Sequence, residues 1–550
     1  MRCVFGLPGT QTIALFEALR RSRIRTIVAT NELSASFMAG GWARITGDSG
    51  VLLTIPGPGF TWAVTGLAEA RLDSIPLLHI CGAPANAPSS KRFRQQELNQ
   101  IAIASPLIKG VVDADAHRDP GIAVLDALLL SRSDEPGPVL LQVSPTTLTR
   151  EYSAVPLDPS FEGTVQTDLL ERVCARVRNA RRPILMVGQG TNRYSDDVRA
   201  LVEQTGMPLL TTPSARGVLP ENHALNLGYE PLAGNVADVN EVIRSSDLVL
   251  VIGCKLAHSG TSGFALDLPS DRLIHIDTSA EVIGANYPPS LGVVADAGVA
   301  LRVLLASAPP RSRWENDEIE AWRARLAIRQ QGSSEPRITG ASSEDARGFF
   351  AALRRALPSD AVLVLDSGLH QILARRYYSV LAPCGLIVPT GLQSMGFAIP
   401  TAIGARLANP DRVVVALTGD GGFAMTALEL LTAVREGVSL IVIVFVDGAF
   451  GQIRMQQLAN YGVGHGVTVE NPDFGLLAAA IGARHVLVRE DEIESSLRDA
   501  LAHSGVTVLQ VAVGDTIAVL RSAAVARARE ASRNVVGAGA VRLIKKLLRK

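Results

Sequence analysis

The stretch from Arg412 to Gly451, RVVVALTGDGGFAMTALELLTAVREGVSLIVIVFVDGAFG, predicts one strand–helix–strand unit. Its runs RVVVALT and SLIVIVFV are apolar and rich in β-branched residues, which is typical of strands buried on both faces. Between them, FAMTALELLTAVREG has apolar residues at helical spacing and stops at Gly437. A connecting helix makes the two strands parallel, and open parallel sheets bind ligands at the carboxyl ends of their strands. The stretch therefore predicts an α/β fold with a binding site at this edge.

Two carboxylates are expected at that edge. Asp420 follows the first strand and Asp447 follows the second, and glycines beside Asp420 allow a backbone to come close to a ligand. Paired carboxylates in this position suit a hard cation that carries a phosphate group. The residues alone also allow a plainer interpretation, in which both are solvated aspartates of turns.

The length and the composition narrow the class of protein. A chain of 550 residues is too long for one core, so we expect about three domains. Its 53 basic and 53 acidic residues balance, which argues against a nucleic-acid binder that neutralises phosphates. The five cysteines show no CxxC or CxxH spacing, so neither a zinc site nor a disulfide framework is indicated. The apolar runs are too short to span a bilayer and no signal segment is evident, so we expect no integral membrane segment and a cytoplasmic location.

The GDG turn and the polar residue that closes the second strand resemble the diphosphate-binding motif of thiamine diphosphate (ThDP) enzymes, in the group of acetolactate synthase-like enzymes and 2-oxo acid decarboxylases. In that family the Asp of GDG, the second residue of the closing pair and a carbonyl two residues later bind Mg²⁺, which holds the diphosphate. The family usually has Asn-Asn or Asn-Asp where this chain has Val446-Asp447. The resemblance assigns Gly419, Gly421 and Gly422 to the cofactor and Asp420, Asp447 and Ala449 to Mg²⁺.

A second motif lies early in the chain. The segment NELSASFMAGGWARITG, which starts at Asn31, is similar to the family's glutamate element and the small-residue helix that follows it. In the family this glutamate binds N1′ of the aminopyrimidine and drives the tautomer that removes the thiazolium C2 proton. The resemblance thus implies a catalytic role for Glu32, although Asn31 stands where the family has His. From the residues alone, Glu32 also fits a plain helix cap.

Other short motifs of the family follow in the same order. The PGPG turn lies close to the cofactor in the family, and an ordinary strand-to-helix turn is the alternative. Gln96 matches a glutamine that faces the reacting centre in acetolactate synthase-like members. Met395 matches an apolar residue that props the cofactor into a V shape, whereas by itself it is expected to be a core methionine. The residues assigned in these motifs are Gly57, Pro58, Gly59, Gly368, Leu369, His370, Gln393 and Met395 for cofactor binding and Gln96 for catalysis.

The resemblance implies three doubly wound parallel-sheet domains. We expect a pyrimidine-binding domain over 1–155, a central domain over 165–308, a diphosphate- and Mg²⁺-binding domain over 345–520, and a basic tail over 521–550 that is solvated or lies on a membrane surface or a partner. The central domain binds FAD in some members. Acetolactate synthase has an arginine where this chain has Ser259, so FAD is not favoured. Acetolactate synthases also tend to have a tryptophan near the position of Gln456, so we expect the residues that read the substrate to differ from that enzyme.

The implied function is ThDP- and Mg²⁺-dependent, non-oxidative decarboxylation of a small 2-oxo acid, with carboligation to a second carbonyl compound. The alternatives are a simple decarboxylase that releases an aldehyde and a non-catalytic subunit with the same fold. Members of the family pair the first domain of one subunit with the third domain of another. We therefore expect Glu32 and Asp420 to meet across the interface of a homodimer or homotetramer.

Overall fold

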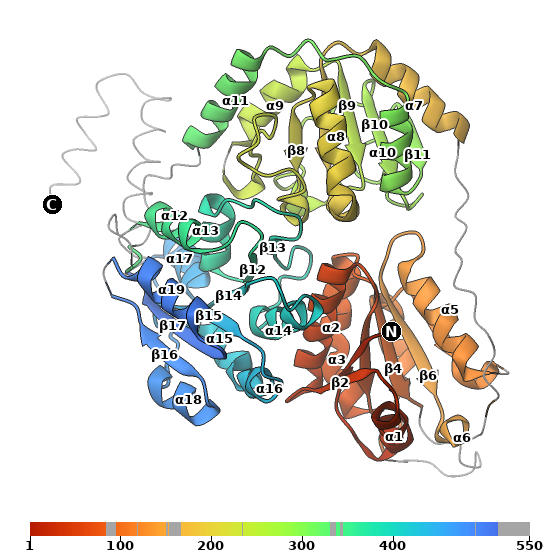
Figure 1. Cartoon of the computed structure of the whole chain (residues 1–550), viewed down its shortest axis with the longest axis vertical. Coiled ribbons are helices and arrows are strands. Elements are labelled where there is room, and N and C mark those ends of the chain that lie inside the picture. Colours follow the sequence, from red (N-terminus) through yellow and green to blue (C-terminus); the bar gives the residue numbers. More distant parts are fainter. Residues whose placement is uncertain are drawn as a thin grey trace.

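The computed structural model of the chain contains three parallel β-sheets, each flanked by helices (Figure 1). The structure describes residues 1–83, 95–117, 119–149, 152, 167–233, 235–329, 337–340, 345–489 and 491–514. The predicted basic tail over 521–550 lies outside the described residues. The expected α/β fold with three parallel-sheet units is confirmed.

The first sheet has the strand order β2-β1-β3-β4-β6-β5. Its strands are β1 (Cys3–Gly6), β2 (Arg25–Val28), β3 (Gly50–Thr54), β4 (Leu77–Gly82), β5 (Gly110–Asp113) and β6 (Pro138–Val143). The helices of this part are α1 (Ile13–Arg21), α2 (Glu32–Thr46), α3 (Pro58–Leu72), α4 (Gln100–Ala104), α5 (Pro120–Arg132) and α6 (Pro145–Leu148).

The second sheet has the order β11-β10-β9-β7-β8. Its strands are β7 (Pro183–Val187), β8 (Leu209–Thr211), β9 (Leu248–Ile252), β10 (Leu273–Asp277) and β11 (Leu291–Val294). The accompanying helices are α7 (Thr167–Asn179), α8 (Ser195–Thr205), α9 (Val236–Ser245), α10 (Ala297–Ala306) and α11 (Asn316–Arg329).

The third sheet has the order β13-β12-β14-β15-β17-β16. Its strands are β12 (Val362–Leu365), β13 (Leu386–Ile387), β14 (Val414–Gly419), β15 (Leu440–Val446), β16 (Arg484–Leu487) and β17 (Val506–Ala512). Its helices are α12 (Ala346–Ala356), α13 (Leu369–Tyr377), α14 (Ala398–Ala408), α15 (Asp420–Thr426), α16 (Leu430–Arg435), α17 (Gly451–Tyr461), α18 (Phe474–Ile481) and α19 (Ile493–Ala502). We call the parts built on these sheets the first, middle and third domains.

The helix predicted between β14 and β15 is broken in the structure. It begins at Asp420, earlier than predicted, and a 3₁₀ turn over Ala427–Glu429 separates α15 from α16. At the start of this turn, the Thr426 hydroxyl donates to the carbonyl of Gly396 (3.1 Å). At its end, Glu429 turns toward the first domain and accepts a hydrogen bond from the backbone N–H of Thr30 (3.1 Å). The break thus coincides with contacts to segments that are distant in the sequence. Helical periodicity carries no information about such contacts.

The first and third domains pack against each other through α2 and α14 (Figure 1). A Cβ atom at Gly41 would collide with the carbonyl of Thr401, and one at Gly404 would collide with that of Met38. Glycine is therefore required at both positions for the two backbones to come this close. The rings of Phe37 and Phe397 add an edge-to-face contact with centroids 5.3 Å apart.

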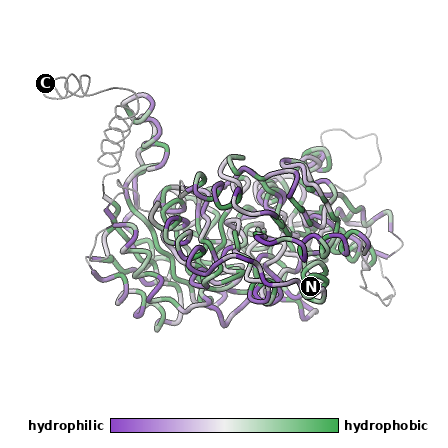
Figure 2. Tube along the Cα trace, turned by 90° about the horizontal axis from the view of Figure 1, so that it is seen from above, coloured by the Kyte–Doolittle hydropathy of each residue, from purple (hydrophilic) through white to green (hydrophobic). Residues whose placement is uncertain are grey.

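Apolar residues are distributed over the whole folded body rather than gathered in one segment. Figure 2 shows hydrophobic and hydrophilic segments interleaved along the chain trace. Within the described ranges, no helix combines the length and the apolarity that a membrane crossing requires.

Candidate active site

Asp420 and Asp447 lie at the ends of neighbouring strands. Gly419 at the end of β14 pairs with Phe445 of β15, so the residues that follow these strands emerge at the same edge of the sheet. Asp420 is 2% exposed, which excludes the interpretation as a solvated turn aspartate for this residue. In the part of the chain that the structure describes, no group of three or more His, Cys, Asp or Glu side chains is placed to hold a metal. A cation at this edge would therefore depend on two carboxylates and on backbone oxygens.

The two carboxylates are held by amide donors. Asp420 accepts from the N–H groups of Gly421 (2.9 Å) and Gly448 (2.8 Å) and from the side-chain amide of Asn471 (2.9 Å). Asp447 accepts from the N–H of Ala449 (3.1 Å). Burial and then the negative charge of Asp420 raise the pKa of Asp447 to about 6. A cation between these groups would relieve both causes, so the donor set fits a divalent metal.

The backbone carbonyl of Ala449 is a third oxygen that could bind a cation together with the carboxylates of Asp420 and Asp447. Residues 448–450 pair antiparallel with 467–469, through bonds from Val469 N–H to Gly448 O (2.9 Å) and from Phe450 N–H to Val467 O (2.8 Å). These bonds bypass Ala449, whose carbonyl accepts no recorded backbone hydrogen bond within the described residues. The turn requires a left-handed backbone at residue 448 (φ 64°), which glycine adopts without strain.

The predicted diphosphate residues line a narrow cradle beside these carboxylates. A Cβ atom at Gly421 would lie 2.7 Å from the ring of Phe450, and one at Gly422 would lie 2.7 Å from the hydroxyl of Thr418. His370, at the start of α13, is buried, and its Nε2 has no hydrogen-bond partner among the residues that the structure describes. Burial lowers the pKa of His370 to about 4, so the ring is neutral at pH 7. The unpaired Nε2, and a glycine backbone without side chains at the edge of the sheet, fit a phosphate-bearing cofactor at the point where the strand order reverses between β12 and β14.

Gly368 and Leu369 lie at the same switch point. Gly368, with φ 146°, is the cap of α13, and Leu369 is its first residue. A Cβ atom at Gly419 would lie 3.3 Å from Nδ1 of His370, so the ends of β14 and the start of α13 are close together.

Asp366 holds the turn that carries Met395. Its buried carboxylate accepts from the N–H groups of Ser367 (2.8 Å), Gly396 (2.9 Å) and Ala398 (3.0 Å), and burial raises its pKa to about 6. Met395 is half-buried, and its Cε lies 3.5 Å from the position of a Cβ at Gly421, so the interpretation as a core methionine is wrong. The neighbouring Gln393 is exposed and has φ 58°, which is unusual for a residue other than glycine.

The first-domain residues form a second group. Asn31, not Glu32, caps α2, because its side chain accepts from the N–H of Ser34 (2.8 Å); the cap interpretation of Glu32 is wrong. The carboxylate of Glu32 reaches the first turn of α3, where a Cβ at Gly59 would lie 2.9 Å from its Oε1. A Cβ at Gly57 would lie 2.9 Å from that of Gln96, and Gly57 has φ 67°. The structure thus brings Glu32, the Gly57–Gly59 turn and Gln96 together.

Among the described residues, no hydrogen bond or ion pair joins the Glu32 carboxylate to Asp420. The recorded contacts of the Glu32 carboxylate are with the first domain, and those of Asp420 are with the third. Their supporting loops are nevertheless joined. One link is the hydrogen bond from the N–H of Thr30 in the first domain to Glu429 in the third. A second is the hydrogen bond from the N–H of Ser394 in the third domain to Glu69 in the first (3.1 Å).

Sequence reasoning missed these supporting residues. Glu429 and Glu69 are both buried although a glutamate in a helical segment is usually a surface residue, so their place in the sequence carries no signal. Asp366 directly follows β12, and a carboxylate at the end of a buried strand is a signal that could have found it. Asn471 lies in a loop and carries no such signal.

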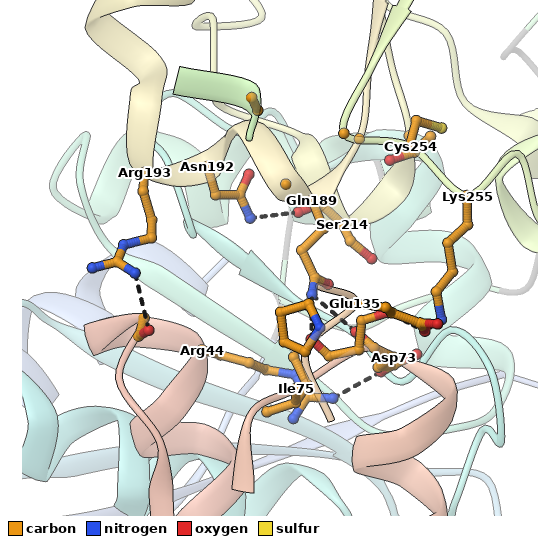
Figure 3. A pocket seen from close by; sticks show the side chains of 18 of the residues that line it. Arg44, Asp73, Ile75, Glu135, Gln189, Asn192, Arg193, Ser214, Cys254 and Lys255 are labelled. Atoms are coloured by element: carbon orange, nitrogen blue, oxygen red, sulfur yellow. Dashed lines mark hydrogen bonds and ion pairs between the residues drawn. The ribbon is translucent and has the colours of Figure 1, made fainter. Parts of the chain in front are cut away.

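A cavity of about 940 Å³ is lined by residues of the first, middle and third domains (Figure 3). Two ion pairs lie in its lining: Arg44 with Asp73 (2.7 Å), and Lys255 with Glu135 (2.5 Å). Ser259, at the position considered for FAD, also lines it. None of the predicted ThDP residues does, so the cavity is separate from both groups described above.

Three parallel α/β domains with a glycine-lined, two-carboxylate edge on the third define the class of enzymes that use thiamine diphosphate. The chain belongs to the thiamine pyrophosphate enzyme family. The family's N-terminal TPP binding domain matches residues 1–103, its central domain matches 170–304, and its C-terminal TPP binding domain matches 366–511.

Curated relatives cover most of the chain. The probable 2-ketoarginine decarboxylase of Pseudomonas aeruginosa is 32% identical over 519 residues, which span 92% of this chain and 90% of the relative. The large subunit of acetolactate synthase isozyme 1 of Escherichia coli is 29% identical over 524 residues, or 93% and 91% of the two chains. The acetolactate synthase large subunit of Lactococcus lactis is 30% identical over 498 residues, or 88% and 85%. The predicted family, and with it an enzyme of the decarboxylase and carboligase group, is confirmed.

Proposed function

We propose that the enzyme uses ThDP and Mg²⁺ to decarboxylate a small 2-oxo acid and joins the remaining acyl unit to a second carbonyl compound. The observation that carries this proposal is that both halves of the required site are present. The third domain offers a glycine cradle with two carboxylates, and the first domain offers Glu32 beside a tight turn. A non-catalytic subunit would have no use for both. When bound, ThDP supplies a nucleophilic carbon and an electron sink.

The residues of the third domain anchor the cofactor in this proposal. Asp420, Asp447 and the carbonyl of Ala449 hold Mg²⁺, which neutralises the diphosphate. The glycines at 419, 421 and 422 let the backbone approach the phosphates, with Gly368, Leu369 and His370 on the other side of the switch point. Met395 and Gln393 shape the space beyond the diphosphate.

The residues of the first domain activate the cofactor. Glu32 would hold the aminopyrimidine of the bound cofactor and exchange a proton with it through its carboxylate. Gly59 makes room for it, since any side chain there would meet its Oε1. Gln96 lies against Gly57, and in this proposal it contacts the substrate.

The site is completed between two copies of the chain, as a homodimer or homotetramer. Each half-site is followed by a helix with exposed apolar residues: Trp62 on α3 (58% exposed), and Met425, Leu428 and Leu431 after Asp420 (54%, 59% and 42%). We call these the apolar rims. Exposed apolar residues that border a functional site are typical of interfaces, and a twofold pairing would cover both rims at once.

A plain decarboxylase that releases an aldehyde is the second candidate. It is favoured by the relative named a 2-ketoarginine decarboxylase and by Ser259 and Gln456, where acetolactate synthase has arginine and tryptophan. Binding of FAD in the cavity lined by Ser259 is not part of either proposal.

Incubation with a panel of 2-oxo acids tests the function. The panel contains pyruvate, 2-oxobutyrate and 2-ketoarginine, with ThDP and Mg²⁺ present or omitted singly. We expect CO₂ release that requires both additions. An acyloin or 2-hydroxy-2-keto acid product supports carboligation, and a free aldehyde supports the second candidate. Absence of CO₂ from every acid, with ThDP bound, would reject both.

A further inference from the structure

Asn471 occupies a fixed position next to the metal carboxylates. The segment before it pairs with residues 448–450, so that Val469 is already bonded to the loop that carries Asp447. Just after it, the Asp473 side chain caps α18 by accepting from the N–H of Leu476 (2.9 Å). The backbone of Asn471 is therefore anchored on both sides.

Only one of the two polar atoms of the Asn471 side chain makes a hydrogen bond among the described residues. Its Nδ2 donates to Oδ2 of Asp420 (2.9 Å), whereas its Oδ1 is buried and has no hydrogen-bond partner among the described residues. Turning the amide round would place its oxygen against the Asp420 carboxylate, which is repulsive. The free group is thus an oxygen acceptor, enclosed beside two carboxylates. A buried acceptor without a donor is unfavourable and indicates a missing partner.

The chemistry of a hard divalent cation supplies such a partner. Mg²⁺ demands near-octahedral coordination and keeps part of its hydration shell in protein sites. Two carboxylates, one carbonyl and a diphosphate leave room for that water, whose hydrogens need acceptors. The Oδ1 of Asn471 is an acceptor of the right kind at this edge.

We propose that Asn471 is a positioning residue for the metal: its Nδ2 orients Asp420, and its Oδ1 accepts a hydrogen bond from the hydration shell of the cation. The proposal rests on the proposed function, since it requires a cation at Asp420 and Asp447. It also couples the metal to the segment 451–470, because that segment leaves from the metal loop and returns to it at Asn471. Such outer partners of metal ligands change metal affinity by about 10- to 100-fold in other proteins.

The test measures metal affinity directly. The full-length protein with saturating ThDP is titrated with Mn²⁺ and free Mn²⁺ is followed by electron paramagnetic resonance. We expect Asn471→Ala to weaken Mn²⁺ binding by about 10- to 100-fold, and Asn471→Gln, which displaces the same amide by one methylene, to weaken it as well. Asn222→Ala, on an exposed asparagine of the middle domain, should leave the affinity unchanged.

Two further readouts separate positioning from folding. The metal-free melting temperature of Asn471→Ala should match that of the parent, and its kcat should return to within about twofold of the parent at saturating Mg²⁺, because the metal ligands themselves remain. If Asn471→Ala fails to fold, Asn471→Gln carries the test. Equal Mn²⁺ affinity of parent and variants would overturn the proposal for Asn471 alone. A parent that binds ThDP without any Mn²⁺ would overturn the proposed metal site and this inference together.

Discussion

The two halves of the proposed site are built in different ways. In the third domain, Asp420 and Asp447 follow adjacent strands of one sheet, and backbone amides of the same domain hold both carboxylates. In the first domain, Glu32 begins a helix and reaches only the turn at Gly59. The first arrangement is complete within one sheet edge. The half-site at Glu32 can act on a cofactor only when a third domain that anchors the cofactor lies against it. Anchoring and activation of the cofactor should therefore be separable by mutation.

Removal of the Glu32 carboxylate should have the largest effect. Glu32→Gln keeps the size of the side chain but cannot exchange a proton with the aminopyrimidine, so we expect kcat for CO₂ release to fall by about 10²- to 10⁴-fold. The affinity for ThDP should change little, because the anchoring groups lie in the third domain. Steady-state kinetics and ThDP titration measure the two quantities. The matched control is Glu171→Gln on an exposed face of α7, which should behave as the parent. An active Glu32→Gln enzyme would show that the first half has no catalytic part.

Asp366 offers a stability test of the half-site in the third domain. Its pKa is raised to about 6 by burial, above the value near 3.9 of an unfolded Asp, so the folded state binds the proton more tightly. The resulting stabilisation is complete below about pH 4 and is lost as the pH rises through 6. This shift corresponds to about 3 kcal/mol. Denaturant unfolding of the metal-free protein between pH 4 and pH 7 should therefore show a decline in stability that Asp366→Asn reduces.

The control for this experiment is Asp411→Asn, an exposed aspartate of the same domain. It should retain the pH dependence of the parent. Identical pH profiles for Asp366→Asn and the parent would contradict the raised pKa of Asp366.

The contrast between the halves also explains what could be predicted from the sequence. The three sheets and the positions of Asp420 and Asp447 follow from apolar runs and the residues directly after them, which are local signals. The break between α15 and α16 could not be predicted, since it accompanies the bond from Thr30 to Glu429 across 399 positions of sequence. Asn471 was missed for the same reason: its contact with Asp420 depends on the pairing of a distant loop with residues 448–450. The choice of Asn31 over Glu32 as the cap was decided by side-chain geometry that a motif does not specify.

The smallest effect, a partial recovery of activity, tests most directly whether the halves belong to different subunits. Glu32→Gln and Asp447→Ala are each inactive in this proposal, one in activation and one in anchoring. In a mixed dimer, one site combines both substitutions and the other has neither. If subunits exchange freely, half of the dimers are mixed and each has one intact site, so the mixture should recover about a quarter of the parental activity. A site built within one chain would recover nothing. Charged substitution of the apolar rim, as in Leu428→Glu, should prevent both the dimer, seen by light scattering, and the recovery, because the two half-sites would no longer meet.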